Sequence, residues 1–203
     1  GSEDSLRRDL ELARDAGVNM LRVGGTMVYE SDLFYQLCDE LGILVWQDFM
    51  FANMDYPVDD PTFHANIRTE AEQQLRRLAA HPCVAVYCGS SEIEQQAAML
   101  GMPREYWSNR WFSEELPGLC GELHPGTVYL PSTPTGGVLP FHTSSGVTHY
   151  YGVGAYLRSV ADMRRDDVKF TPECLGFANL PEPKTAASPD GDDGSRRRNR
   201  RRG

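Results

Sequence analysis

The chain has 203 residues, 40% of them hydrophobic, which is enough for one large domain or two small ones with a sizeable core. Its formal net charge of −9 argues against nucleic acid as the main partner. No apolar run approaches the roughly 18 residues that a membrane span requires, and no signal-peptide pattern opens the sequence, so we expect no membrane partner.

The cysteines are odd in number and widely spaced, and the sequence contains no C-x-x-C pair. Most of them lie inside apolar runs, which predicts buried free thiols rather than disulfides or a zinc site. Free thiols favour a reducing compartment, so we expect a cytoplasmic protein. The sequence shows neither metal-ligand spacing nor a phosphate-binding glycine loop, and no metal or other cofactor is expected. The five cysteines are Cys38, Cys83, Cys88, Cys120 and Cys174.

The first half of the sequence repeats one unit three times: an amphipathic helix, a stop signal and a short apolar strand. The second helix, for example, starts after Ser31 and ends at Gly42, which are typical residues for the two ends of a helix. Three such units with no hairpin signal between them predict a parallel sheet and an α/β fold. The helices are expected at 5–17, 31–42 and 60–81, and the strands at 18–23, 43–46 and 84–87.

The third strand leads directly to a carboxylate. Residues 84–87 are apolar and mostly β-branched or aromatic, which predicts a strand buried on both faces. Gly89 and two serines end the run, and Glu92 opens a segment, 93–100, that is expected to be helical. A carboxylate at such a junction lies where barrel enzymes place catalytic groups. The alternative is a first-turn acid that the helix dipole favours, and the residues leave both interpretations open.

The second half of the sequence is less regular. Residues 131–137, Pro-Ser-Thr-Pro-Thr-Gly-Gly, are too polar and Gly-rich to pack and are expected to form a loop. The last strand ends in a second carboxylate, Glu173. Helices are expected at 105–120 and 156–163, and strands at 127–130, 147–151 and 168–173.

The end of the sequence, residues 184–203, has a different composition. It holds six arginines and one lysine against three aspartates and shows no apolar periodicity, so we expect a disordered Arg-rich tail. Such a run either binds an anionic partner or is simply a solvated segment. Residues 1–183 are expected to form the folded domain.

Three blocks of sequence carry a resemblance to a known family. They are Ala16-Gly-Val-Asn-Met-Leu-Arg22, the run from Tyr29 to Phe51 that contains Gly-Ile-Leu-Val-Trp-Gln-Asp, and His81-Pro-Cys-Val-Ala-Val-Tyr-Cys-Gly-Ser-Ser-Glu92. Together they resemble the catalytic barrel of glycoside hydrolase family 2, and within it the β-mannosidase branch, from about residue 5 to 183. The resemblance implies a (β/α)8 barrel of the TIM type, a carbohydrate substrate and retaining hydrolysis of β-glycosidic bonds.

The resemblance also implies a two-carboxylate site. Glu92 matches the general acid/base, which follows the fourth strand of the family's barrel. Glu173, in Phe170-Thr-Pro-Glu-Cys-Leu-Gly176, matches the nucleophile after the seventh. The two carboxyl groups of a retaining pair lie about 5–5.5 Å apart, so that the charge of one raises the pKa of the other.

Substrate-binding positions follow from the same resemblance. The family keeps an arginine near the nucleophile, and Arg22 would hold Glu173 ionised there, the alternative being a surface ion pair. At the end of strand 43–46, Asp48 is expected to hydrogen-bond sugar hydroxyls, and Trp46 either stacks on a sugar ring or fills the core. Enzymes of this clan often place an aromatic hydroxyl beside the nucleophile, after the sixth strand. The candidates there are His149, Tyr150 and Tyr151, with Asn53 and Ser132 as weaker sugar contacts.

Two departures from the family pattern stand out. The family usually has Asn before the acid/base, where its amide contacts the sugar 2-hydroxyl, whereas here Ser91 follows Ser90. The shorter hydroxyl is expected to alter activity or preference. Barrels of this type typically need ~250 residues, and only six strands are found, matching the second to the seventh. We therefore expect a fragment of a larger enzyme, whose open edges need the missing barrel strands or self-association to cover them.

Three functions are compatible with the sequence. The first is a retaining β-mannosidase-like hydrolase, the second a non-catalytic or impaired sugar-binding relative marked by Ser90-Ser91, and the third an interaction module that uses the basic tail. Because both carboxylates are present, the sequence favours the first. The preferred sugar is not determined by the sequence.

Overall fold

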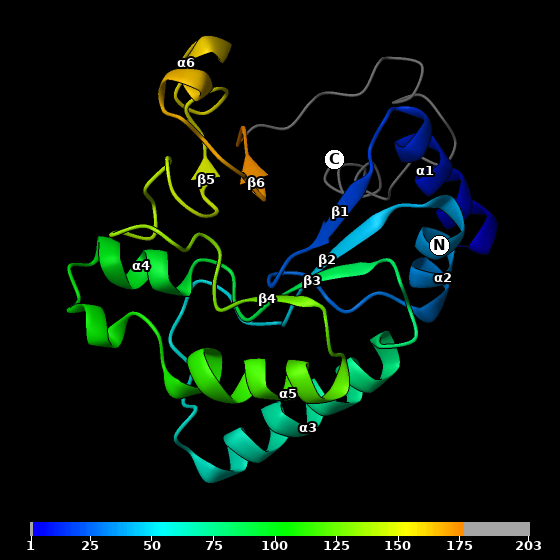
Figure 1. Ribbon diagram of the computed structural model, residues 1–203, viewed down its shortest axis with the longest axis horizontal. Helices are drawn as coiled ribbons and strands as arrows, with labels where there is room; N and C mark the ends of the chain where they lie inside the picture. The colour runs from blue at the N-terminus through cyan, green and yellow to red at the C-terminus, as the bar shows by residue number, and fades with distance from the viewer. Residues whose placement is uncertain (1, 177–203) are drawn as a thin grey trace, which may run out of the picture.

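The computed structural model describes residues 2–176, in which the strands form two parallel sheets (Figure 1). The larger sheet has four strands in the order β1-β2-β3-β4, and the smaller pairs β5 with β6. The α/β class and the parallel pairing predicted from the repeated units are therefore confirmed. The strands are β1 (Met20–Val23), β2 (Leu44–Asp48), β3 (Val84–Cys88), β4 (Val128–Leu130), β5 (His149–Tyr150) and β6 (Glu173–Cys174).

The first three helices are α1 (Glu3–Asp15), α2 (Asp32–Leu41) and α3 (Pro61–Leu78), and each precedes a strand as predicted. Their ends follow local chemistry. Ser2 caps α1 by accepting a hydrogen bond from a backbone N–H of the first turn, and Asp60 caps α3 in the same way. Gly42 ends α2 with a φ of 71°, a left-handed conformation that glycine adopts without strain.

The hydrophobic core lies where these helices pack on the sheet. Figure 1 shows α3 and α5 (Leu116–Leu123) lying together on one side of the strands, with α1 and α2 beside β1 and β2. The middle strands β2 and β3 supply the most buried positions, as expected for strands covered on both faces. Fully buried core side chains include Tyr35, Leu37, Val45, Leu75, Leu78 and Tyr87.

The prediction of one long helix at 105–120 is wrong. After α4 (Ile93–Met99), the chain forms a 3₁₀ turn at Arg104–Tyr106, a π-helical turn at Trp111–Glu115 and only then α5. Pro117 has no backbone N–H, so the α-helical bonding pattern is interrupted at this point. The N–H of Leu116 instead bonds the carbonyl of Trp111, the i to i+5 spacing of a π-turn.

The last strand and helix also differ from the prediction. Strand β6 begins at Glu173 rather than ending there, and residues 168–172 are not a strand, since Pro172 cannot donate a ladder hydrogen bond. The register places Glu173 opposite His149 across the β5–β6 pair. Helix α6 (Val160–Arg165) lies four residues later than the expected start of 156.

The predicted thiols are mostly buried. Four of the five cysteines are buried and free, while Cys174 is exposed. Among residues 2–176 there is no helix long and apolar enough to cross a membrane. The expected Arg-rich tail at 184–203 and the end of the expected domain at 177–183 lie outside the described residues.

Candidate active site

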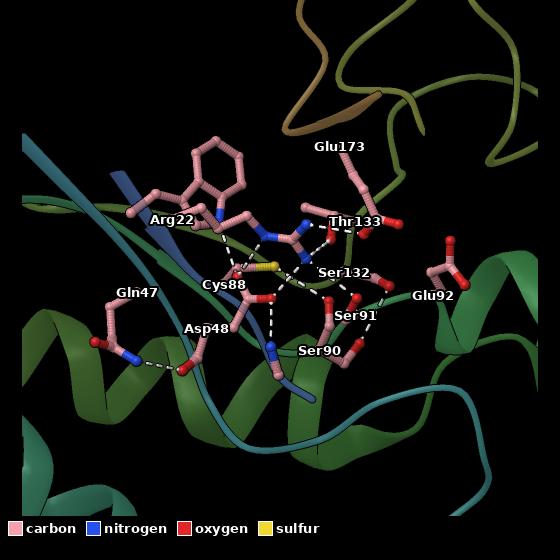
Figure 2. A network of polar contacts seen from close by, with 12 residues as sticks. Arg22, Gln47, Asp48, Cys88, Ser90, Ser91, Glu92, Ser132, Thr133 and Glu173 are labelled. Carbon is pink, nitrogen blue, oxygen red and sulfur yellow. Dashed lines mark hydrogen bonds and ion pairs between the residues drawn. The ribbon is translucent and has the colours of Figure 1, made fainter. Parts of the chain in front are cut away.

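Arg22, near the end of β1, stands at the centre of a polar network at the carboxyl ends of the strands (Figure 2). Its Nη2 lies 2.7 Å from Oδ2 of Asp48, and its Nη1 donates to Oε2 of Glu173 at 3.2 Å. The same Nη2 lies 3.1 Å from the hydroxyls of Ser91 and Thr133. One guanidinium therefore connects the ends of β1 and β2, the first residue of β6 and the segments that follow β3 and β4.

Asp48, the last residue of β2, lies beneath Arg22 and its side chain is fully buried. Besides Arg22, it accepts hydrogen bonds from the N–H of Gly25 at 2.9 Å and from Nε1 of Trp46 at 2.8 Å. A buried charge needs such partners to offset desolvation. The carboxylate oxygens of Asp48 are enclosed and already bonded in this geometry, and the expected contact of Asp48 with sugar hydroxyls stays a prediction.

Trp46 lies in the core. Its side chain stacks on Phe170 with ring centroids 5.7 Å apart and an interplanar angle of 11°, and the residue is 3% exposed. Of the two roles expected from the sequence, core packing and sugar stacking, the structure supports packing. Trp46 contributes to the site through its hydrogen bond to Asp48.

Arg22 is held as a cation. Burial alone would lower the pKa of its guanidinium, but the hydrogen bond and the charge of Asp48 outweigh burial, and the pKa is raised. A permanent positive charge therefore faces Glu173. The alternative of a surface ion pair for Arg22 is wrong, since its side chain is only 14% exposed.

Glu92 follows β3 and immediately precedes α4, with a left-handed φ of 62° that costs a residue with a side chain about 1–2 kcal/mol. Its backbone N–H donates to the carbonyl of Thr133 at 2.6 Å, which fixes the turn. Its carboxylate does not cap the helix and instead accepts from Nε2 of Gln95 at 3.0 Å and contacts Nδ1 of His149 at 2.7 Å. Glu92 is thus more than a dipole-favoured helix acid.

Glu173 reaches the same place from β6. Its Oε1 accepts a hydrogen bond from the hydroxyl of Tyr151, and its Oε2 is bonded by Arg22 and lies 3.7 Å from Nδ1 of His149. Tyr150 points away and donates to Oδ2 of Asp162 at 2.6 Å. The sequence left open which of residues 149–151 bonds Glu173. In the structure, the hydroxyl that contacts Glu173 is that of Tyr151.

The two carboxylates converge although they are 81 positions apart in the sequence. Glu92, His149 and Glu173 each offer one side-chain oxygen or nitrogen, and these atoms all lie within 4.8 Å of one another. His149 bridges the pair, since the imidazole contacts one carboxylate and faces the other. The site is therefore an acid–imidazole–acid cluster with a guanidinium on one flank.

Comparison with known proteins identifies the relatives of this chain. The β-mannosidase of Capra hircus is 48% identical over 100 residues, which cover 49% of this chain and 11% of that protein. β-Mannosidase B of Aspergillus flavus is 38% identical over 161 residues, covering 72% and 19%. The crystal structure of β-D-mannosidase from Dictyoglomus thermophilum matches with a TM-score of 0.76 at 39% identity, over 84% of this chain and 21% of that one.

The chain is a partial homologue of the family 2 β-mannosidases. It spans about a fifth or less of the length of these relatives. No protein-family profile matches it. A β-glucuronidase from Parabacteroides merdae shares the fold with a TM-score of 0.50 at 21% identity. The resemblance predicted from the three sequence blocks is thereby confirmed.

The ionisation of Glu92 differs from the expectation for a family 2 acid/base. The hydrogen bond from His149 lowers the pKa of Glu92, and burial, which acts in the opposite direction, does not compensate. The expected rise in the pKa of this carboxyl is therefore absent. The physical reason is that an imidazole N–H stands between the two carboxylates and favours the ionised form of Glu92.

Glu92, His149 and Glu173 also have the donor set and spacing of a metal site. Carboxylate and imidazole donors suit a divalent cation, yet Glu173 is already bonded by Arg22 and Tyr151. A cation at this point would lie close to the fixed positive charge of Arg22. The described geometry fits an ion-paired and hydrogen-bonded cluster better than a metal centre.

Of the remaining expected residues, the three serines are buried and Asn53 is exposed. Ser91 is buried against Arg22, while Ser90 donates to the fully buried Ser132 at 3.1 Å. Asn53 is exposed and has a φ of 61°, and its N–H bonds the carbonyl of Ser91 at 2.9 Å. None of the three serines offers a free sugar contact in this arrangement.

Sequence analysis missed three contributors: Thr133, Gln95 and Gln96. Thr133 contacts Arg22, and both glutamines bond Glu92, with Nε2 of Gln96 at 3.4 Å from the carboxylate. The glutamines lie three and four residues after Glu92, which is the spacing that brings helical side chains back to one place. That spacing was visible in the sequence and is the signal that could have found them.

Proposed function

We propose that this chain carries the catalytic centre of a retaining glycoside hydrolase that acts on β-linked sugars, in particular β-mannosides. The observation that supports this most is the approach of the Glu92 and Glu173 carboxylates, with oxygens within 4.8 Å. Retaining enzymes hold their pair about 5–5.5 Å apart, whereas inverting enzymes need about 6.5–9.5 Å to admit a water. The β-mannosidase relatives support the choice of sugar.

Glu173 is proposed as the nucleophile. Arg22 and Tyr151 both donate to its carboxylate, which favours the ionised form that attacks the anomeric carbon. Attack forms a covalent bond between Glu173 and the sugar as the bond to the leaving oxygen breaks. Arg22 would also stabilise the carboxylate when water later releases the sugar. Asp48 positions Arg22 from below and does not touch substrate in this scheme.

Glu92 is proposed as the general acid/base. It gives a proton to the leaving oxygen in the first step and takes one from water in the second. The lowered pKa favours the ionised form of Glu92 in the resting site, so the acid role requires Glu92 to gain a proton when the sugar binds. Burial already acts to raise the pKa of Glu92, and a sugar that excludes water strengthens this effect. His149 is the contact that must weaken for the acid role.

The proposed scaffold is an incomplete (β/α)8 barrel formed by residues 1–183. Strands β1 to β6 would correspond to the second to seventh barrel strands, in agreement with the neighbour order of the four-stranded sheet and the match to the Dictyoglomus enzyme. In such a barrel, catalytic side chains gather at the carboxyl ends of the strands, which is where Arg22, Asp48 and Glu92 lie.

The buried free thiols support a protein that works in a reducing compartment, and we propose the cytoplasm.

An alternative function is a sugar-binding fragment with impaired catalysis. Two observations favour it: the lowered pKa of Glu92, and the engagement of the Ser91 hydroxyl with Arg22 rather than with an open pocket. Such a protein would bind a β-mannoside and release it unchanged.

A panel of aryl β-glycosides separates the two functions. The proposal expects turnover of the β-mannoside, and Glu173→Ala should abolish it, by at least about 10³-fold, while sugar binding persists. Glu122→Ala, an exposed carboxylate on α5, is the matched control and should keep full activity. Binding without turnover of any sugar supports the alternative.

A trapped intermediate gives the sharper answer. A 2-deoxy-2-fluoro mannosyl donor should leave one covalent sugar on the peptide that contains Glu173, detected by mass spectrometry. A label on Glu92, or turnover with no covalent intermediate, would contradict the assigned roles. Full-length chain should be used throughout.

A further inference from the structure

Two amide side chains contact the carboxylate of Glu92 from the first turn of α4. Nε2 of Gln95 donates to Oε1 of Glu92 at 3.0 Å, and Nε2 of Gln96 lies 3.4 Å from Oε2. Figure 2 shows Glu92 at the start of this helix, beside the polar network around Arg22. We propose that Gln95 is a positioning residue, which anchors Oε1 and so makes Oε2 the oxygen that exchanges the proton with the substrate. The inference rests on the acid/base role proposed above for Glu92.

The two carboxylate oxygens of Glu92 are bonded unequally. Oε1 is contacted by Nδ1 of His149 at 2.7 Å as well as by Gln95, so two groups hold it at ordinary hydrogen-bond lengths. Within residues 2–176, Oε2 is hydrogen-bonded by Gln96 alone, and the distance of 3.4 Å is longer than is usual for an N–H···O bond. Oε2 is therefore the oxygen that an incoming sugar engages most readily.

The amide of Gln95 is not used to cap the helix. In a capping box, the side chain three residues after the N-cap accepts a hydrogen bond from the backbone N–H of the N-cap residue. Glu92 is the N-cap residue of α4, but its N–H is already donated to the carbonyl of Thr133 at 2.6 Å. Gln95 instead turns its NH₂ group to the carboxylate, and the residue is only 9% exposed. A buried amide with this single direction is suited to orienting one carboxylate oxygen.

The anchored oxygen and the lightly bonded oxygen have different parts in acid catalysis. A proton on Oε1 would point at the N–H groups of Gln95 and of the His149 imidazole, whereas a proton on Oε2 meets one weak donor. Oε2 passes its proton to the glycosidic oxygen as the bond between this oxygen and the anomeric carbon breaks. The negative charge left on the carboxylate is shared with Oε1, where both hydrogen bonds strengthen as the charge forms.

Gln96 has a different relation to the acid. Its side chain is half-buried, and its long contact is with the oxygen that the leaving group must reach. An arriving glycosidic oxygen takes the place of this contact, so Gln96 matters less than Gln95 for proton transfer. Both amides lower the pKa of Glu92, and Gln96 is the larger influence of the two. The test therefore depends on the leaving group rather than on pH.

The test compares two leaving groups on the full chain. The ratio kcat/KM, which covers the steps up to the first covalent bond, is measured for phenyl β-mannoside and for 2,4-dinitrophenyl β-mannoside. Phenolate needs a proton in order to leave, whereas dinitrophenolate leaves without one. General acid catalysis contributes about 10²–10⁴-fold, so Gln95→Met, which keeps the length but loses the donor, should lower kcat/KM for the phenyl substrate by about tenfold or more. For the dinitrophenyl substrate, which does not need the acid, the loss should be no more than about threefold.

Three further variants complete the comparison. Gln95→Asn keeps an amide but shortens its reach, and it should show the same selective loss even if Gln95→Met lowers the melting temperature. Gln96→Met should lose clearly less than Gln95→Met on the phenyl substrate. Gln73→Met, at an exposed position of α3, is the control and should leave both substrates unaffected.

The outcomes separate this inference from the proposed function. If both Gln95 variants slow the two substrates alike or leave both unaffected, or if Gln96→Met shows the larger selective loss, the inference is wrong although the parent chain is active. If the parent chain hydrolyses neither mannoside, the proposed function fails and this inference with it.

Discussion

Nδ1 of His149 lies 2.7 Å from Oε1 of Glu92, and this contact is the largest influence that lowers the pKa of the carboxyl. His149 arrives from β5 and Glu92 from the start of α4, so the contact also joins the small sheet to the large one. Within residues 2–176, Nε2 of His149 is buried and has no hydrogen-bond partner. The polar contacts of the imidazole are therefore concentrated on the two carboxylates.

Loss of the imidazole should shift the pH dependence of turnover. His149→Leu removes the hydrogen bond that lowers the pKa of Glu92, so this pKa rises and Glu92 stays protonated to higher pH. Because a general acid works in its protonated form, the basic limb of the kcat/KM profile for an aryl β-mannoside should move to higher pH. Thr148→Val, a buried neighbour whose hydroxyl has no described partner, is the control. An unmoved basic limb would refute this role of His149.

The same variant should change the acid sensitivity of the fold. A carboxyl whose folded pKa is lowered stabilises the protein above its ordinary pKa of 4.5, and this contribution is lost as the pH falls through the lowered value. His149→Leu should therefore show a smaller loss of stability over that acid interval than the parent chain. The measurement is urea unfolding at pH values from about 3 to 6. Equal losses in the two proteins would mean that Glu92 is not stabilised by His149.

Tyr151 and Tyr150 make a matched pair for mutation. Tyr151→Phe removes a hydroxyl that donates to Glu173, and kcat should fall by about 10- to 100-fold with little change in stability. Tyr150→Phe removes a hydrogen bond to Asp162 instead, and it should lower the melting temperature while sparing kcat. Steady-state kinetics and thermal unfolding check both variants. The opposite pattern would show that the wrong tyrosine has been assigned to the site.

The assignment of Tyr151 shows where sequence reasoning stops. The helix–strand repeats were predictable because their periodicity and end residues are local: Gly42 and Asp60 mark helix ends by their own chemistry. The hydroxyl partner of Glu173 depends instead on the register of β5 against β6, which pairs His149 with Glu173. A two-residue strand leaves too little alternation to fix that register in advance.

Asp48 illustrates a second limit of prediction from sequence. Its place at the end of β2 was predicted, and it does lie at the site. Whether its side chain opens to substrate or lies beneath Arg22 depends on what covers it, here the guanidinium and the N–H of Gly25. Sequence pattern locates a residue along a strand, whereas burial of one polar side chain by another is a tertiary property.

The Arg22–Asp48 pair should be important for stability as well as for the site. Arg22→Met leaves the fully buried Asp48 without its counter-charge, and about 3–5 kcal/mol of unfolding free energy should be lost. Urea unfolding measures this, and adding Asp48→Asn should recover part of the loss. Arg7→Met removes an exposed pair with Glu40 and should cost no more than about 1 kcal/mol. Equal effects of the two arginine variants would contradict the buried-pair argument.

Gly89 connects β3 to the turn that carries Glu92, and close packing requires glycine there. A Cβ at this position would lie 2.5 Å from the hydroxyl of Tyr129 and 2.6 Å from the carbonyl oxygen of Pro131. Gly89→Ala should therefore lose about 1–3 kcal/mol of stability through overpacking, as measured by urea unfolding. Gly121→Ala is the matched control, since a Cβ there meets no neighbour within 4 Å. Within α5, Gly121→Ala should instead raise the unfolding free energy by about 0.5–1 kcal/mol.

Because strain at Gly89 displaces the chain that leads to Glu92, turnover should fall in Gly89→Ala and persist in Gly121→Ala. A stable and fully active Gly89→Ala protein would show that the end of β3 tolerates movement.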